Sequence, residues 1–206
     1  GQGHEIVTFI EGEVSNYPLS AAAASEEALT SAAALLRGYH DATVSFLATQ
    51  LDNYAWFLPA RAPAEVICHG DFAPYNVVLN GRHAIAIIDF DTAHPAPRLW
   101  DVAYAVYRWA PLTISADAPA GANHLEEQIR RGRLFCDHYG LSSAQRQQLV
   151  PTAVERLHAL VHFMHVGAQN GNEAFQANIA DGHDRLYLAD IEYLQAHQAE
   201  ITNGLD

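Results

Sequence analysis

The sequence predicts an α+β fold that is mainly α-helical and contains short β-hairpins. Half of the 206 residues are apolar, which is typical of a globular chain of one large or two small domains. Alanine- and leucine-rich stretches with helical spacing occupy both ends of the chain. Between them, apolar runs flank Asn80-Gly81, the strongest two-residue hairpin signal.

Charge and composition narrow the possible partners. Eleven basic residues, all arginine, stand against 24 acidic residues and give a formal net charge of −13. An acidic surface disfavours nucleic acid and attracts cationic ligands, although general solubility explains most such carboxylates equally well. No apolar run approaches the roughly 20 residues that span a bilayer, no signal-peptide pattern opens the chain, and two cysteines are too few for a disulfide scaffold. We therefore expect a cytoplasmic protein without nucleic-acid or membrane partners.

The N-terminal part predicts one strand and one helix. Residues 4–13 mix β-branched and aromatic side chains, which favours a strand that runs into a turn. Residues 20–53 are rich in Ala and Leu and predict a helix, with Ser20 or Ser25 as its N-cap. His40 lies on one face of this helix. We expect it to be a hydrogen-bonded core residue, because no second metal ligand lies at helical spacing.

The central segment, residues 65–91, carries the polar groups of interest. An apolar strand at Val66–Cys68 leads into His-Gly-Asp, which ends at Asp71. A polar loop then ends at Asn76, and the second strand of the hairpin leads to Asp89. We expect these short strands to pair with one another, so that the three polar side chains meet at strand ends on rigid supports.

The remainder of the chain predicts helices. The expected helical stretches cover residues 101–110, 123–139, 155–167 and 184–198. Gly140 suits the end of the second stretch, and Ser142 and Gln145 have capping-box spacing. In the final helix we expect three side chains to point inward: Leu186, Ile191 and Leu194.

Three histidines on the third of these stretches have helical spacing. His158, His162 and His165 lie at i, i+4 and i+7. Two histidines at i, i+4 can hold zinc, but the glutamate of an HExxH motif is missing. We therefore expect these histidines to pack against the core and not to bind a metal.

The polar groups of the central segment suit phosphoryl transfer. Oxygen ligands favour a hard cation, and Mg²⁺ takes one or two protein ligands together with substrate phosphates. Asn76 and Asp89 can hold such an ion, which leaves Asp71 to accept a proton from a substrate hydroxyl. The alternative is a tight hairpin whose turns are capped by Asp and Asn. The whole pattern, HGDxxxxN followed by a hairpin and DFD, favours the catalytic interpretation.

These motifs carry a resemblance to a known family. HGDFAPYNVVL, AIIDFDTA and RLWDVAY resemble the catalytic lobe of the aminoglycoside phosphotransferase and choline kinase-like family of small-molecule kinases. The resemblance implies a catalytic Asp71 and Mg²⁺ ligands at Asn76 and Asp89, with Asp91 assisting a second metal position. It also implies that His69 and the buried Asp101 brace the catalytic loop.

The resemblance further implies a protein-kinase-like C-terminal lobe, residues 14–206, that uses Mg²⁺ and ATP or GTP. Residues 1–13 correspond to a remnant N-lobe strand and hinge, and the backbone of Phe9, Ile10 and Glu11 is expected to bind the nucleotide base. The expected substrate is a small molecule with a hydroxyl group, amine-bearing and similar to an aminoglycoside or choline. Four carboxylates in the helical region are candidates to bind its ammonium groups: Glu155, Glu173, Asp181 and Asp184. The alternative is that each is only a solvated surface residue.

Two departures support a rival interpretation. The chain has neither an N-lobe nor any lysine, whereas kinases of this kind place a lysine on an N-lobe strand against the phosphates. Arginine does not simply replace it, because its planar fork presents donors differently from an ammonium. The rival is therefore a non-catalytic pseudokinase, or an isolated lobe that binds a ligand or partner. Its unpaired N-terminal strand is expected to mediate a homodimer.

Overall fold

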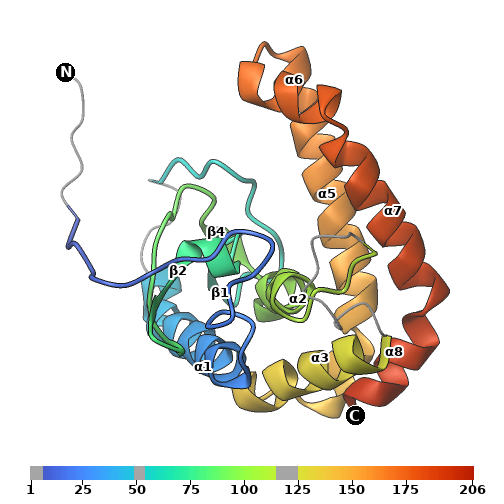
Figure 1. Ribbon diagram of the computed structural model, residues 1–206. Helices are drawn as coiled ribbons and strands as arrows, with labels where there is room; N and C mark the ends of the chain where they lie inside the picture. Colours follow the sequence, from blue (N-terminus) through green and yellow to red (C-terminus); the bar gives the residue numbers. More distant parts are fainter. Residues whose placement is uncertain (1–6, 49–53, 115–124) are drawn as a thin grey trace.

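The structure is a computed structural model that describes residues 7–48, 54–114 and 125–206. It is mostly helical with short antiparallel strands, in agreement with the predicted α+β class (Figure 1). The α-helices of the described residues are α1 Glu26–Thr43, α2 Arg98–Trp109, α3 Leu125–Tyr139, α4 Ser143–Gln147, α5 Leu149–Gln169, α6 Glu173–Ala180, α7 His183–Ala196 and α8 Gln198–Leu205. No helix in these ranges combines the length and apolar content needed to cross a membrane.

The strands form two separate two-stranded antiparallel sheets. The first pairs β1, Val66–Cys68, with β4, His94–Ala96. The second pairs β2, Val77–Asn80, with β3, His83–Ile87. The sequence predicted that β1 pairs with the hairpin, and this prediction is wrong. The partner strand β4 was missed because its Pro95 suggests a chain break; proline is tolerated here because a two-stranded sheet consists only of edge strands.

The β2–β3 hairpin is confirmed, with its loop shifted by one residue. Asn80 pairs with His83, so the two loop residues are Gly81 and Arg82 and not Asn80 and Gly81. Gly81 has a φ of 61°. Type I′ and II′ hairpin loops require a positive φ at their first position, which glycine adopts without strain.

The expected N-terminal strand is not formed in its described part. Residues 1–6 lie outside the described residues. Residues 7–12 adopt no strand, and the chain runs outward from Gly12, which lies against Leu79, toward the N-terminus (Figure 1). Only Glu13 makes an isolated antiparallel bridge, with Leu79. Val7 and Phe9 are 72% and 89% exposed. An apolar segment without a neighbouring strand has no ladder partner, so its β propensity alone does not produce a strand.

Helix α1 begins where its cap predicts. The side chain of Ser25 accepts a hydrogen bond from the Ala28 N–H, so Ser25 and not Ser20 is the N-cap. The helix ends at Thr43, ten residues before the expected end, and a short 3₁₀ turn follows at Ser45–Ala48. Its buried face joins the main core, whose largest fully buried side chains include Trp109, Phe72 and Phe135.

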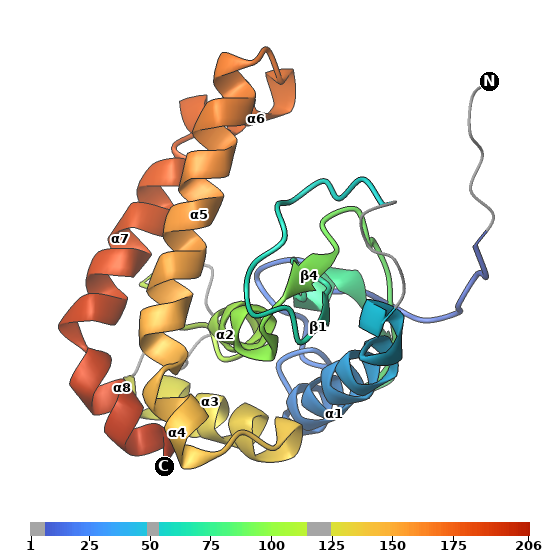
Figure 2. The same ribbon diagram turned by 180° about the vertical axis from the view of Figure 1, so that it is seen from behind.

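Helices α5, α6 and α7 form an arm that extends from the body, with α6 at its tip (Figure 1, Figure 2). The predicted capping box of Ser142 and Gln145 is present at α4. In α7 Ile191 and Leu194 are buried as expected, but Leu186 is 53% exposed, because α7 packs mainly on α5 and leaves its outer face to solvent.

The expectation that the three arm histidines pack against the core is wrong for His158 and His162, which are exposed. His165 is half-buried, with its Nε2 3.0 Å from Asp184 Oδ2. The described residues contain no metal-type cluster at these histidines. They lie on the sides of α5 that its apolar seam does not cover.

Candidate active site

The loop after β1 depends on a glycine. Gly70 has a φ of 86°, and a side chain there would collide with the carbonyl oxygen of Thr92. The Thr92 hydroxyl donates to the carbonyl oxygen of His69 at 3.0 Å. Glycine therefore allows the loop to lie directly against Thr92, and this contact sets the position of the backbone that leads into Asp71.

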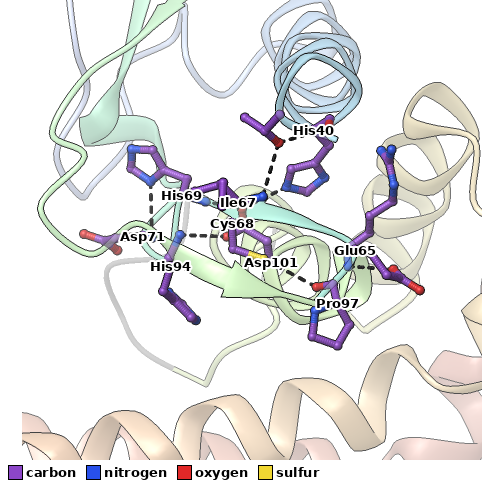
Figure 3. A network of polar contacts seen from close by, with 12 residues as sticks. His40, Glu65, Ile67, Cys68, His69, Asp71, His94, Pro97 and Asp101 are labelled. Carbon is purple, nitrogen blue, oxygen red and sulfur yellow. Dashed lines mark hydrogen bonds and ion pairs between the residues drawn. The ribbon is translucent and has the colours of Figure 1, made fainter. Parts of the chain in front are cut away.

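Asp101, which is 1% exposed, fastens this loop to the helices (Figure 3). Its carboxylate accepts the backbone N–H groups of His69 at 2.6 Å and Gly70 at 3.0 Å. His40 Nε2 lies 3.0 Å from the same carboxylate, and His40 Nδ1 lies 2.7 Å from the Tyr139 hydroxyl. The prediction that His40 is a hydrogen-bonded core residue is confirmed. His40 of α1 and Asp101 of α2 thus hold the loop in place.

Asp101 remains ionised despite its burial. Burial raises the pKa of its carboxyl group, but the hydrogen bond and charge of His40 and the charge and backbone N–H of His69 lower it to about 2. His40, Cys68 and Asp101 bring ligand-type atoms within 4.8 Å of one another. These atoms already have protein partners, including the Pro97 carbonyl oxygen for the Cys68 thiol at 3.4 Å, so we interpret the cluster as structural.

The Asp71 carboxylate is fixed by two neighbours. Oδ1 accepts the Tyr75 hydroxyl at 2.7 Å, and Oδ2 accepts the Asn76 amide Nδ2 at 3.0 Å. The same amide donates to the Asp71 carbonyl oxygen at 3.0 Å. A one-turn 3₁₀ segment, Pro74–Asn76, brings these two residues back toward Asp71. Because Asn76 uses its amide nitrogen, its amide oxygen is left as an acceptor.

His69 links this loop to the segment after the hairpin. Its Nδ1 accepts the Asp71 N–H at 3.2 Å, and its Nε2 lies 2.9 Å from the Ile88 carbonyl oxygen. The Ile88 N–H donates to the carbonyl oxygen of Asn76 at 3.0 Å. Asp89 follows Ile88 in the sequence, so its backbone starts one residue from this hydrogen bond to Asn76.

Asp89 and Asp91 are exposed, and neither carboxylate has a hydrogen-bond or ion-pair partner in the described part of the chain. Asp89 has a φ of 63°, a left-handed conformation that is uncommon outside glycine and clusters at functional sites. The carboxylates of Asp71, Asp89 and Asp91 do not form a group whose ligand atoms all lie within 4.8 Å of one another among the described residues.

The residues expected to form the nucleotide hinge lie in the extended N-terminal segment. Phe9 is 89% exposed, Ile10 is 37% exposed and Glu11 is exposed. They precede the bridge between Glu13 and Leu79, which ties the end of this segment to β2. Their role as a hinge stays a prediction.

A cavity of about 640 Å³ opens beside Asp71, between the loop and the helical arm. Asp71, Gly70 and Tyr75 contribute its polar edge. The arm and α2 contribute most of its apolar and aromatic wall: Trp100, Tyr104, Leu160, Phe163, Met164, Phe175 and Tyr187. This volume is in the range of small-molecule sites.

The four carboxylates expected to meet a substrate are not gathered in this cavity. Glu155 lines it, but its carboxylate is 3.2 Å from the guanidinium of Arg61. Glu173 and Asp181 are exposed on the arm and do not line it. Asp184 is directed to His165 and to the Arg185 N–H. Of the four, only Glu155 lines the cavity, and its carboxylate is paired.

Two residues of the site were missed in the sequence. Tyr75 holds Asp71, and Arg156, which is 6% exposed, donates through Nη2 to the Gly70 carbonyl oxygen. The signal for Arg156 was present, because it lies at i+3 from Ala153 and next to Leu157 on the buried face of α5. A charged residue on an apolar helical face is expected to have a specific partner.

Comparisons with known proteins agree with the site. Residues 47–135 match the family described as "Phosphotransferase enzyme family", which confirms the resemblance over the segment that holds both loops. The chain is 31% identical over 150 residues to a protein of Rhizobium leguminosarum bv. trifolii named trifolitoxin immunity protein. The match covers 70% of this chain and 55% of the relative, so the chain spans about half of the relative's length. No solved structure matches the chain significantly.

Proposed function

We propose that this chain forms the kinase-like catalytic lobe of a small-molecule phosphotransferase, because its residues 47–135 match the phosphotransferase enzyme family. The reaction is transfer of the γ-phosphoryl group of ATP or GTP to a hydroxyl group of a small substrate. The observation that carries the proposal is the fixed Asp71 carboxylate, which lies at the edge of an apolar cavity and beside the exposed Asp89 loop.

Asp71 is the group that receives the substrate hydroxyl. Tyr75 and Asn76 hold its two carboxylate oxygens, and Asp101 and Arg156 hold the backbone of the preceding Gly70. A carboxylate with so little freedom can orient a hydroxyl and accept its proton as the phosphoryl group arrives. Because the cavity lies beside Asp71, the substrate body has space while its hydroxyl reaches the carboxylate.

The residues present suit a magnesium nucleotide. The amide oxygen of Asn76 and the unpartnered carboxylates of Asp89 and Asp91 are hard oxygen ligands, which Mg²⁺ prefers. When bound, the ion supplies positive charge against the phosphates and the developing transition-state charge. Phe9, Ile10 and Glu11 are proposed to meet the base. Without lysine, nucleotide binding by this chain is expected to be weak.

Calorimetric titration with ATP, with and without Mg²⁺, tests this proposal. Asp89→Asn keeps a side chain that tolerates the left-handed backbone but removes the charge, so Mg²⁺-dependent binding should fall at least about tenfold, or roughly 1.4 kcal/mol. Asp71→Asn should keep that binding and lose phosphoryl transfer in any form of the protein that transfers phosphate. Asp181→Asn, at an exposed carboxylate outside the cavity, is the matched control. Nucleotide binding that ignores both Mg²⁺ and Asp89→Asn would contradict the proposal.

A second candidate is a binding protein without catalysis. The relative is named an immunity protein, and the cavity beside Asp71 has the volume of a small-molecule site. Under this alternative the chain protects by holding a toxic compound in the cavity. Asp71→Asn separates the two, because it should leave protection intact in a binding protein and abolish it in a phosphotransferase.

A further inference from the structure

We propose that the phosphate acceptor is an uncharged hydroxyl compound with a large apolar or aromatic body, and not a polycation or a quaternary ammonium compound. This inference rests on the proposed function and names its substrate class. It replaces the amine-bearing substrate expected from the sequence. Three features of the cavity carry it: its walls, its charge and the use of its aromatic faces.

Much of the cavity wall is aromatic and aliphatic. Leu160, Phe163 and Met164 lie at i, i+3 and i+4 on α5, and Phe175 comes from α6. The rings of Phe163 and Phe175 meet edge to face with centroids 5.4 Å apart, and Phe57 meets Phe163 at 5.3 Å. These three rings therefore offer a cluster of apolar surface, whose burial favours a molecule with an equally apolar body.

With histidine counted as neutral, the formal charge of the cavity lining is zero although the chain carries −13. Its acidic residues are Asp71 and Glu155, its arginines are Arg61 and Arg156, and its histidines are His94, His162 and His183. Glu155 is paired with Arg61, and Asp71 is reserved for the reacting hydroxyl. A polycation would therefore lose its hydration without gaining a free carboxylate, which makes its binding unfavourable.

Two of the aromatic faces of the cavity, those of Trp100 and Tyr104, are already used by the protein's own cations. The guanidinium carbon of Arg61 lies 3.6 Å from the ring centre of Trp100. That of Arg156 lies 4.6 Å from the Tyr104 ring and 5.7 Å from the Trp100 ring. A ligand cation would share these faces with two fixed positive charges, so cation–π attraction is cancelled by repulsion.

Binding measured by isothermal titration calorimetry on the full chain tests the inference without requiring turnover. The probes are 2-(2-naphthyl)ethanol as the uncharged aryl alcohol, kanamycin as the polycation and choline as the quaternary ammonium compound. The naphthyl alcohol should bind at least about tenfold more tightly than either cation. Phe163→Ala should weaken it about tenfold, whereas Leu186→Ala, at an exposed apolar residue on the same arm, should not.

Two outcomes would overturn the inference. One is tighter binding of kanamycin or choline than of the naphthyl alcohol, with loss in Phe163→Ala. The other is no binding of the naphthyl alcohol, or binding unaffected by Phe163→Ala. Either outcome can occur while the chain still binds nucleotide in a Mg²⁺-dependent way and Asp89→Asn still weakens that binding. In that case the inferred substrate class fails and the proposed function stands.

Discussion

Asp101 shows how one buried charge can organise a reactive loop. It accepts hydrogen bonds from two successive backbone N–H groups, and His40 of α1 contacts the same carboxylate at 3.0 Å. Removal of the carboxylate leaves buried donors without partners, at a cost of roughly 1–3 kcal/mol. We therefore expect Asp101→Ala to lower the free energy of unfolding, measured with urea. The exposed Asp137→Ala is its control, and an unchanged midpoint for Asp101→Ala would contradict the role.

The same residue predicts how stability depends on pH. Its folded pKa of about 2 lies below the unfolded value, so its contribution is present above about pH 4 and is lost as pH falls toward 2. The difference corresponds to stability on the order of 2 kcal/mol. Asp101→Asn should therefore flatten the pH dependence of urea unfolding in this interval. An identical slope in both proteins would exclude Asp101 as its source.

Tyr75 predicts an effect on rate without an effect on nucleotide binding. Its hydroxyl holds Asp71 Oδ1 at 2.7 Å, and loss of a hydrogen bond to a charged group costs about 1.5–3 kcal/mol. In a form of the protein that transfers phosphate, Tyr75→Phe should lower kcat at least about tenfold. Tyr193→Phe, which loses a bond to Gln128 away from the cavity, is the matched control. Equal rates for the two variants would remove Tyr75 from the positioning of Asp71.

At the scale of elements, the features that could be predicted are those set by contacts between residues close in the sequence. The Ser25 cap, the capping box at Ser142 and the hairpin around Gly81 follow from hydrogen bonds between near neighbours. Strand β4 could not be predicted, because its partner lies far away in the sequence and Pro95 hides its extended backbone. Asp71, Asn76 and Asp89 were located by spacing, whereas Arg156 reaches the loop only through the packing of α5.

The cap of α1 provides a stability test at this scale. Ser25 satisfies the Ala28 N–H at the start of the helix that carries His40. Ser25→Ala should lower the free energy of unfolding by about 1 kcal/mol. Ser45→Ala, at an exposed serine after the helix end, should change it by less than about 0.5 kcal/mol. Equal effects of the two substitutions would contradict capping by Ser25.

At the scale of the whole molecule, the exposed N-terminal segment predicts self-association. Residues 7–12 form no strand edge of the kind expected to mediate a dimer, but Val7 and Phe9 expose 72% and 89% of their surface. Exposed apolar side chains of this kind favour contact with a second surface. We expect light scattering to show a dimer that is lost when both residues are changed to Ser. Leu186→Ser is the control, and a monomeric wild type would contradict the prediction.

The arrangement of arm and body has a consequence for how this protein can diverge. The hydrogen bonds that hold Asp71 come from the central loops, α1, α2 and a single arm residue, Arg156. The cavity wall comes mainly from other positions of the arm. Selection for a new substrate can therefore replace one wall of the site while the reactive groups keep their places. Adaptive substitutions should accumulate at Leu160, Phe163 and Phe175 and spare the polar loop.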